Sequence, residues 1–185
     1  MRVFVVTPPE PVVSLDEAKA HLRVRHGAED DLIKAYVAAA TGHIDGPEGW
    51  LGRAIGMQTL EVREDVFRDC MRLPFPPIVD IVSVKHLDAA AAEVTILPSE
   101  YEVRGLLIGS AFGKRWPSVL AQPESVRIQY RAGYDTLPPA IRAAILLMTG
   151  DLYANRETTA AGTSTASIPM STTVENLLQP FRVFA

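Results

Sequence analysis

The spacing of apolar residues changes twice along the chain, and this change limits the folds that the sequence can adopt. Towards both ends, large apolar residues recur every three or four positions, which is the period of a helix that packs by one face. Over residues 57–131, β-branched and aromatic residues partly alternate with polar ones between clusters of Pro and Gly, as in short strands. The pattern predicts an α+β fold that is mainly α: a small helical bundle with an inserted antiparallel β section and an extended C-terminal tail.

Three segments carry the helical period. The first helix is expected over residues 14–26, where Ser14 and Glu17 have the spacing of a capping box. The second is expected over residues 29–45. The third, over residues 138–157, is the longest and starts at two prolines, which a first helical turn tolerates because its amide hydrogens have no partner within the helix.

The clearest strand lies in the sequence SVRIQYRAGY. Its residues Val126, Ile128 and Tyr130 share one face, whereas Arg127 points to the other, because side chains alternate along a strand. This pattern predicts a strand with one face on the core and one face in water. Whether residues 58–131 form one sheet or two short hairpins stays open at this point.

The length of 185 residues favours one folded domain of ordinary size. We assign residues 1–157 to this domain. Residues 158–167, TTAAGTSTAS, are small or polar and are assigned to a flexible linker. Residues 168–185 are assigned to a docking tail, and the chain from about residue 158 onward is expected to be mobile while no partner is bound.

The final segment, VENLLQPFRVFA, is unusually apolar for a chain end, and such an end is ordered only when something holds it. We therefore predict that it docks on another chain. The predicted partner-binding residues, which contact either a neighbouring subunit or a separate protein, are Ile168, Leu177, Leu178, Phe181, Arg182 and Phe184. The alternative is that the segment packs on the 138–157 helix of its own chain.

Composition excludes several classes of protein. A formal net charge of -4 argues against a broad basic face that grips nucleic acid. The sequence holds no run of 18 apolar residues, so no membrane-spanning helix is expected. Cys70 is the single cysteine, which excludes an internal disulfide and a multi-cysteine metal site and indicates a reducing intracellular origin.

No arrangement of residues predicts catalysis, a cofactor or a metal site. The four histidines do not have the spacing of a metal-binding pair, and each is expected at the surface or its rim: His21, His26, His43 and His86. An enzyme with a site that one sequence does not reveal is the least favoured hypothesis. A second hypothesis is a small DNA-binding module without catalytic activity, in which Trp116 lies beside the basic Lys114 and Arg115.

Six stretches, taken in their order, are more informative than any single motif: SLDEAKAHLRV, EDDLIKAYVAAATGHID, GRAIGMQTLEV, LPFPPIVDIVSVKHLD, VRIQYRAGYDTLPPAIRAAILLMTGDLYANRE and LLQPFRVF. Together they cover most of the chain. This layout resembles the head-to-tail connector, or adaptor, proteins of long-tailed bacteriophages and of phage-like gene transfer particles.

The resemblance implies a structural virion protein at the head-tail interface, assembled in the bacterial cytoplasm. Its copies would form a ring, expected to be dodecameric to match the portal, that extends the DNA channel and gives a platform for the tail. The implied partners are the portal protein, a stopper or tail-completion protein, and double-stranded DNA that passes without sequence-specific binding.

Two further groups of residues receive roles from this resemblance. The 138–157 helix has more apolar surface than one core face needs, so its subunit-subunit candidates are Leu146, Leu147, Tyr153 and Arg156. The candidate contacts with DNA in the channel are Lys114 and Arg115.

Overall fold

The computed structural model describes residues 1–155 and 170–183. Helices hold 31% and strands 28% of the structure, so the α+β class is confirmed, whereas the expectation of a mainly α fold built as a helical bundle is not supported. One reason for the higher share of strand is an additional strand near the N-terminus. No strand is predicted before residue 57, yet the β-branched and aromatic sequence RVFVVT forms strand β1 (Arg2–Thr7) on the edge of a sheet.

The chain folds into two compact units, which differs from the division at residue 157. The strand unit comprises Met1–Glu10 and Arg53–Asp135, and the helical unit comprises Pro11–Gly52 and Thr136–Ala185. Each unit is therefore built from two separate stretches of chain. The expected β section gains its N-terminal strand from outside the predicted segment.

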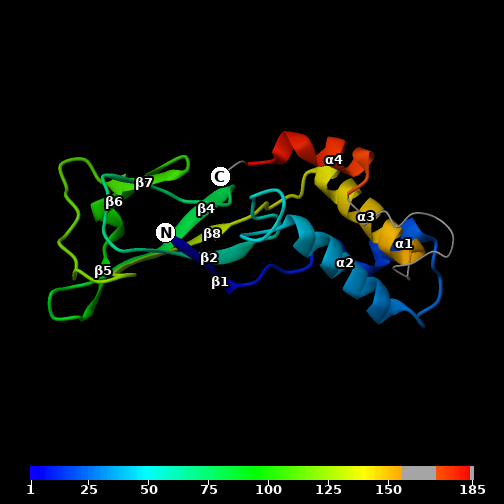
Figure 1. Cartoon of the computed structure of the whole chain (residues 1–185), viewed down its shortest axis with the longest axis horizontal. Coiled ribbons are helices and arrows are strands. Elements are labelled where there is room, and N and C mark those ends of the chain that lie inside the picture. The colour runs from blue at the N-terminus through cyan, green and yellow to red at the C-terminus, as the bar shows by residue number, and fades with distance from the viewer. Residues whose placement is uncertain (156–169, 184–185) are drawn as a thin grey trace. The chain divides into compact units, whose positions relative to one another are not determined.

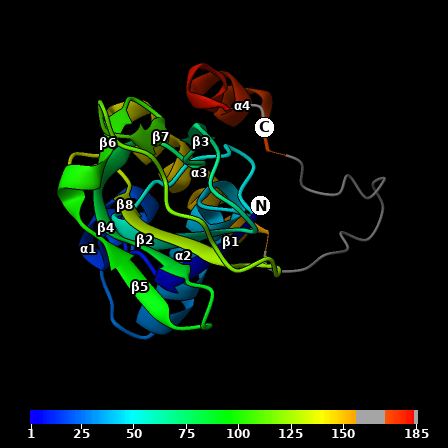
Figure 2. The same ribbon diagram turned by 90° about the vertical axis from the view of Figure 1, so that its left-hand side faces the viewer.

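The strand unit contains two antiparallel sheets, so residues 58–131 form neither one sheet nor two short hairpins. The larger sheet has the strand order β1-β2-β8-β4-β5 (Figure 2). Its strands after β1 are β2 (Gln58–Glu64), β8 (Val126–Ala132), β4 (Ile78–Leu87) and β5 (Glu93–Ile96). The smaller sheet has the order β3 (Cys70–Arg72), β7 (Leu107–Ser110) and β6 (Tyr101–Arg104), and the 3-10 turn η1 (Pro98–Glu100) precedes β6.

Strand β8 lies at the centre of the larger sheet and supplies much of its core. Its predicted inward residues Val126, Ile128 and Tyr130 are all 0% exposed, so the predicted alternation is confirmed. The Tyr130 hydroxyl donates to the carbonyl oxygen of Pro74 at 2.8 Å. Burial raises the pKa of Tyr130, so this hydroxyl stays protonated and keeps its role as donor.

The helical unit is arranged around α3 (Pro139–Ala154), which contacts the three other α-helices described (Figure 1). These are α1 (Leu15–Leu22), α2 (Asp30–Ile44) and α4 (Thr172–Leu178), and the 3-10 turn η2 (Gln179–Phe181) follows α4. On α3, Ile141 and Ile145 are 0% exposed, as expected from their spacing of four. None of the described helices has the length and apolar character needed to cross a membrane.

Helix α1 begins as predicted but is shorter than predicted. The Ser14 hydroxyl accepts a hydrogen bond from the backbone N–H of Glu17 at 3.2 Å. The Glu17 carboxylate does not complete a capping box; it accepts from Arg142 of α3 at 2.8 and 3.1 Å instead. The helix ends at Leu22, before the predicted residue 26, because Arg23 adopts a left-handed conformation with φ 58°.

The central position of β8 gives a stability prediction. Truncating the fully buried Ile128 to Ala leaves a cavity in the core, so we expect the free energy of unfolding to fall by about 2–5 kcal/mol. The matched control is Val82→Ala in β4, where the side chain is 53% exposed and the change should stay within about 0.5 kcal/mol. Urea denaturation followed by circular dichroism measures both. Equal losses in the two variants would contradict the assignment of the core.

Candidate interaction surfaces

The C-terminal segment folds back on its own helical unit. Helix α4 is capped by Ser171, whose hydroxyl accepts from the backbone N–H of Val174 at 3.4 Å. Val174 and Leu178, four residues apart, lie on one face and are both 0% exposed. Helix α4 contacts α3. This part of the tail therefore packs on the 138–157 helix of its own chain, which was the alternative to docking on another chain.

The predicted tail anchors therefore have different surroundings. Leu178 is buried in its own unit, whereas Leu177, Phe181 and Arg182 are half-buried. Ile168 and Phe184 lie outside the described residues, as does half of the segment expected to be mobile. The described part of that segment, residues 170–183, is packed and largely helical.

The end of the described tail is held by the turn that follows α2, in a contact that we call the clasp. The backbone N–H of Val183 donates to the carbonyl oxygen of Leu51 at 2.9 Å. The guanidinium carbon of Arg182 lies 4.1 Å from the centre of the Trp50 ring, a cation–π geometry. Gly52 has φ +62°, and a Cβ at this position would lie only 2.6 Å from the Val183 carbonyl oxygen. The clasp therefore requires glycine at residue 52.

Sequence reasoning missed the clasp. Gly52 stands in the sequence EGWLGR, where a glycine indicates a turn but not what lies against it. Only the fold brings Trp50 and Gly52 next to residues that are more than 120 positions later in the sequence.

The subunit-subunit candidates on α3 have contacts within their own unit. Leu146 and Leu147 are half-buried. The Tyr153 hydroxyl donates to the carboxylate of Glu29, just before α2. Arg156 lies outside the described residues. The packing of α4 on α3 accounts for part of the extra apolar surface of the 138–157 helix. A role for these residues in contacts between subunits stays a prediction.

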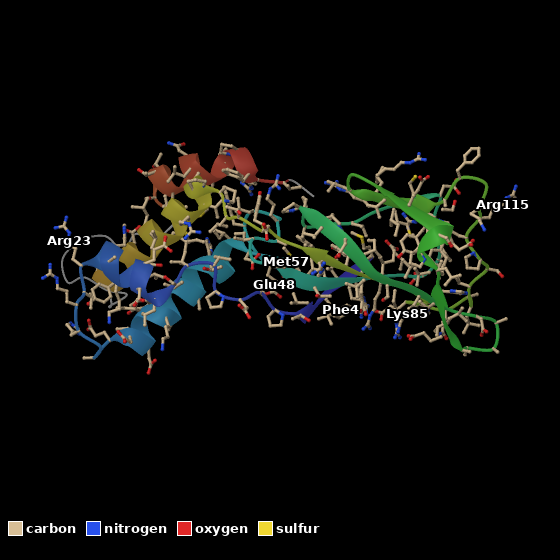
Figure 3. The ribbon with its side chains drawn as sticks, turned by 180° about the vertical axis from the view of Figure 1, so that it is seen from behind. Phe4, Arg23, Glu48, Met57, Lys85 and Arg115 are labelled. Atoms are coloured by element: carbon tan, nitrogen blue, oxygen red, sulfur yellow. The ribbon has the colours of Figure 1, made fainter. Side chains whose placement is uncertain are left out.

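The outward face of the larger sheet carries a row of basic side chains, which we call the basic row. Strand pairing places Arg2 opposite Arg63, Arg63 opposite Arg127, and Arg127 opposite Lys85. Phe4 and Lys85 project from the same side of the sheet (Figure 3), and the Arg63 guanidinium carbon lies 4.4 Å from the Phe4 ring centre. Like charges directly opposite one another destabilise a sheet, so this row needs compensation.

Two carboxylates, one just before β8 and one at the start of β5, supply that compensation. Glu124 accepts from Arg2 at 2.9 Å and from Arg63 at 3.0 Å. Glu93 accepts from Lys85 at 2.7 Å and from Arg127 at 3.3 Å. Each of these two glutamates therefore joins neighbouring members of the basic row. The hydrogen bond from Arg63 lowers the pKa of Glu124, and that from Lys85 lowers the pKa of Glu93.

Glu61 is the most enclosed carboxylate of this face, with the residue only 6% exposed. It accepts from Arg63 Nε at 2.6 Å and from Gln129 Nε2 at 2.7 Å. Burial by itself raises the pKa of Glu61, but the hydrogen bonds from Gln129 and Arg63 outweigh it and the net pKa lies below the ordinary value. Glu61 is thus a charged acceptor at neutral pH.

The residues of the DNA-binding hypothesis lie on the loop after β7. They line an open depression of about 710 Å³. Lys114 Nζ donates to Glu100 at 2.9 Å, and one face of Trp116 is covered by Phe67, with ring centres 4.4 Å apart and planes 4° apart. Arg115 is exposed and points away from the ribbon (Figure 3). Of the expected basic-aromatic group, Lys114 is therefore paired with Glu100 and Trp116 is stacked on Phe67, whereas Arg115 extends into solvent.

The histidines do not form a site. His21, His26 and His43 are exposed as expected, but His86 is 6% exposed and lies in the core face of β4. Its burial was missed because the prediction rested on residue type, whereas the strand places His86 two residues after the buried Val84 and opposite the buried Val126. Within the described ranges, no group of three His, Cys, Asp or Glu residues could hold a metal ion.

Residues 12–68 match the family model of the phage gp6-like head-tail connector protein. The predicted resemblance to the head-tail connector family is confirmed. The matched segment contains α1, α2 and β2, and it includes the first three of the six stretches on which the resemblance rested. The match therefore spans residues from both units.

Over its whole length the chain is also similar to proteins in gene transfer agent (GTA) particles. It aligns with a chain from the neck of an empty GTA particle computed with C6 symmetry, with a TM-score of 0.78 and 24% identity, covering 100% of this chain and 97% of that one. The same coverage holds for a chain from the virion of a native GTA particle, with a TM-score of 0.76 and 23% identity. It also holds for a chain from the neck of a native GTA particle computed with C12 symmetry, with a TM-score of 0.71 and 20% identity. At these identities the likeness establishes a shared fold. No curated protein matches the sequence.

The surroundings of Glu61 predict a pH-dependent contribution to stability. Glu61→Gln removes the charge that Arg63 and Gln129 bind, so at pH 7 we expect it to lower the free energy of unfolding by about 1–3 kcal/mol. Because the folded-state pKa lies below the unfolded one, the contribution is present at neutral pH and is lost as the pH falls through the carboxyl range. Urea denaturation of both proteins at pH 7 and below pH 4 should give a difference that shrinks in acid. A difference independent of pH would contradict this role.

The clasp predicts a specific effect of a methyl group at residue 52. Gly52→Ala places a Cβ against the Val183 carbonyl, so the clasp should open and the backbone amides of residues 174–183 should exchange their hydrogens faster. Gly105→Ala is the matched control, because Gly105 has nearly the same φ, +63°, with nothing within 4 Å of the added Cβ. Hydrogen exchange measured by mass spectrometry distinguishes them. Unchanged exchange in Gly52→Ala, or equal acceleration in both, would show that the clasp does not hold the tail.

Proposed function

We propose that this chain is a structural virion protein that forms a ring between the portal of the DNA-filled head and the neck or tail. The ring extends the DNA channel and provides the platform to which the tail attaches. The observation that carries this proposal is the match of residues 12–68 to the head-tail connector family. We infer no catalytic activity for the chain.

The shared fold supports the proposed place in the particle. The proteins with this fold belong to necks and virions of GTA particles, and two of those structures were computed with C6 and C12 symmetry. A ring with the symmetry of the portal, which we take to be dodecameric, fits such a neck. The chain then belongs at the head-tail interface of the virion, after assembly in the bacterial cytoplasm.

Two protein partners follow from this place in the particle: the portal protein on one side, and a stopper or tail-completion protein on the other. On the described tail, Leu177, Phe181 and Arg182 keep part of their surface exposed and are the proposed contacts, together with Ile168 and Phe184. Leu146, Leu147, Tyr153 and Arg156 stay the candidates for contacts between subunits. Leu178 supports these contacts indirectly, because it fixes α4 on α3.

Double-stranded DNA is the third proposed partner, and it passes through the channel without sequence-specific binding. A conduit must not hold phosphates tightly, because basic contacts with phosphates supply the main part of non-specific affinity. The net charge of -4 and the carboxylates that pair with the basic row agree with this requirement. Arg115 and Lys114 stay proposed points of passing contact.

Electron microscopy of the protein mixed with portal-bearing heads tests the proposal. We expect a ring stacked coaxially on the portal. Leu177→Asp should reduce the fraction of heads that carry a ring, because it puts a charge on a half-buried apolar contact of the tail. The matched control is the exposed neighbour Asn176→Asp, which should leave that fraction unchanged.

Heads without added density would contradict the ring proposal. The alternative, a small DNA-binding module, predicts instead that the isolated protein shifts the mobility of DNA in a salt-dependent way. In that case Arg115→Ala and Lys114→Ala should each weaken the shift.

A further inference from the structure

The connection between α3 and α4 is much longer than their packing requires. Helix α3 ends at Ala154 and α4 begins at Thr172, so 17 residues lie between them. The two helices run in opposite directions along one another (Figure 1). Two to five residues are enough to join antiparallel helices. The position of α4 on α3 is therefore fixed by its contacts and not by a short loop.

These contacts define a binding site, which we call the seat: the face of α3 that contacts α4, together with the turn Trp50–Gly52. The seat takes three features of the segment 171–183. It buries Val174 and Leu178, it places the Trp50 ring against Arg182, and it accepts the backbone N–H of Val183 at the Leu51 carbonyl.

The close approach at Gly52 places the backbone of the bound segment directly against the turn. The Val183 carbonyl oxygen comes within 2.6 Å of the place where a Cβ would start, so the segment can lie there only because residue 52 has no side chain. All of the features that the seat binds lie within residues 171–183, and an identical segment from a second copy presents the same features. The seat therefore has no means of distinguishing its own tail from that of a neighbour.

We propose that, in the assembled ring, the seat of each copy binds the tail of the adjacent copy. This inference rests on the proposed function, because it needs copies held side by side. Reach is sufficient: 17 residues span at most about 60 Å when extended, which is about twice the diameter of a small domain. The occupant of the seat is thus residues 171–183 of a second copy of this chain.

The energetics permit the exchange in the assembly. In an isolated chain the tail occupies its own seat, since the two are covalently joined. The contacts are identical in both arrangements, which is why exchanging an element between copies costs little. In a ring, each copy gives one tail and receives one, so no seat and no tail is left unpaired, and each additional contact is effectively intramolecular. The exchange links neighbours without any new interface chemistry.

Two variants of the full chain isolate the exchange. Leu178→Asp disables the tail and leaves the seat intact and empty. Trp50→Ala combined with Gly52→Ala disables the seat and leaves the tail intact. Each variant alone should sediment as a monomer, whereas an equimolar mixture should form a one-to-one complex. A mixture of folded variants that sediments as monomers would overturn the proposal.

A peptide spanning residues 170–183 keeps the test decisive if a variant loses its fold. Labelled with a fluorophore, it should bind a milder empty-seat variant, Leu178→Ala, more tightly than the wild-type chain, whose own tail competes. The same peptide with Asp in place of Leu178 is the control and should not bind. Circular dichroism reports whether each variant is folded. Equal binding of both peptides, or no binding to a folded empty-seat variant, would contradict tail exchange.

The outcome separates this inference from the proposed function. A ring on the portal with no association in the variant mixture refutes tail exchange and leaves the ring proposal standing. Association in the mixture with no ring on the portal supports exchange between copies and refutes the placement at the portal.

Discussion

The pairing of β8 with β2 and β4 is the constraint on which the strand unit depends. Burial of Ile128 and Tyr130 fixes which face of β8 points inward, and a shift by one residue would turn every side chain to the opposite face. The same register sets Arg127 between Arg63 and Lys85. The apolar core and the basic row on the outer face are therefore two results of one alignment, and the bridging glutamates make that alignment electrostatically acceptable.

The helical unit depends in a comparable way on α3, which provides a packing surface for the other three α-helices described. The apolar sequence of the tail predicts a segment that docks on another protein. The structure gives it a seat within its own unit, made of α3 and the turn at Trp50–Gly52. This finding changes the proposed use of the tail in an assembly, because the same seat serves a neighbouring copy through identical contacts.

Sequence periodicity predicted the elements better than it predicted their arrangement. The helices around residues 15–22, 30–44 and 139–154 were expected within a few residues, and so was the alternation of β8. Strand β1 was missed because six residues beside prolines carry too little pattern to distinguish a strand from an extended lead-in. His86 was misassigned to the surface because histidine is polar, although it lies two residues after the buried Val84 and therefore on the same face of β4.

The sequence by itself determined the α+β class, the main helices, the capping of α1 by Ser14 and the resemblance to head-tail connectors, since each depends on neighbouring residues or on their order. The tertiary structure alone decided the clasp, the basic row and the burial of Leu178. Each of these joins residues that are far apart in the chain, such as Leu51 with Val183 or Arg2 with Glu124. Such contacts depend on how strands pair and helices pack, and a local pattern carries no information on which distant partner it will meet.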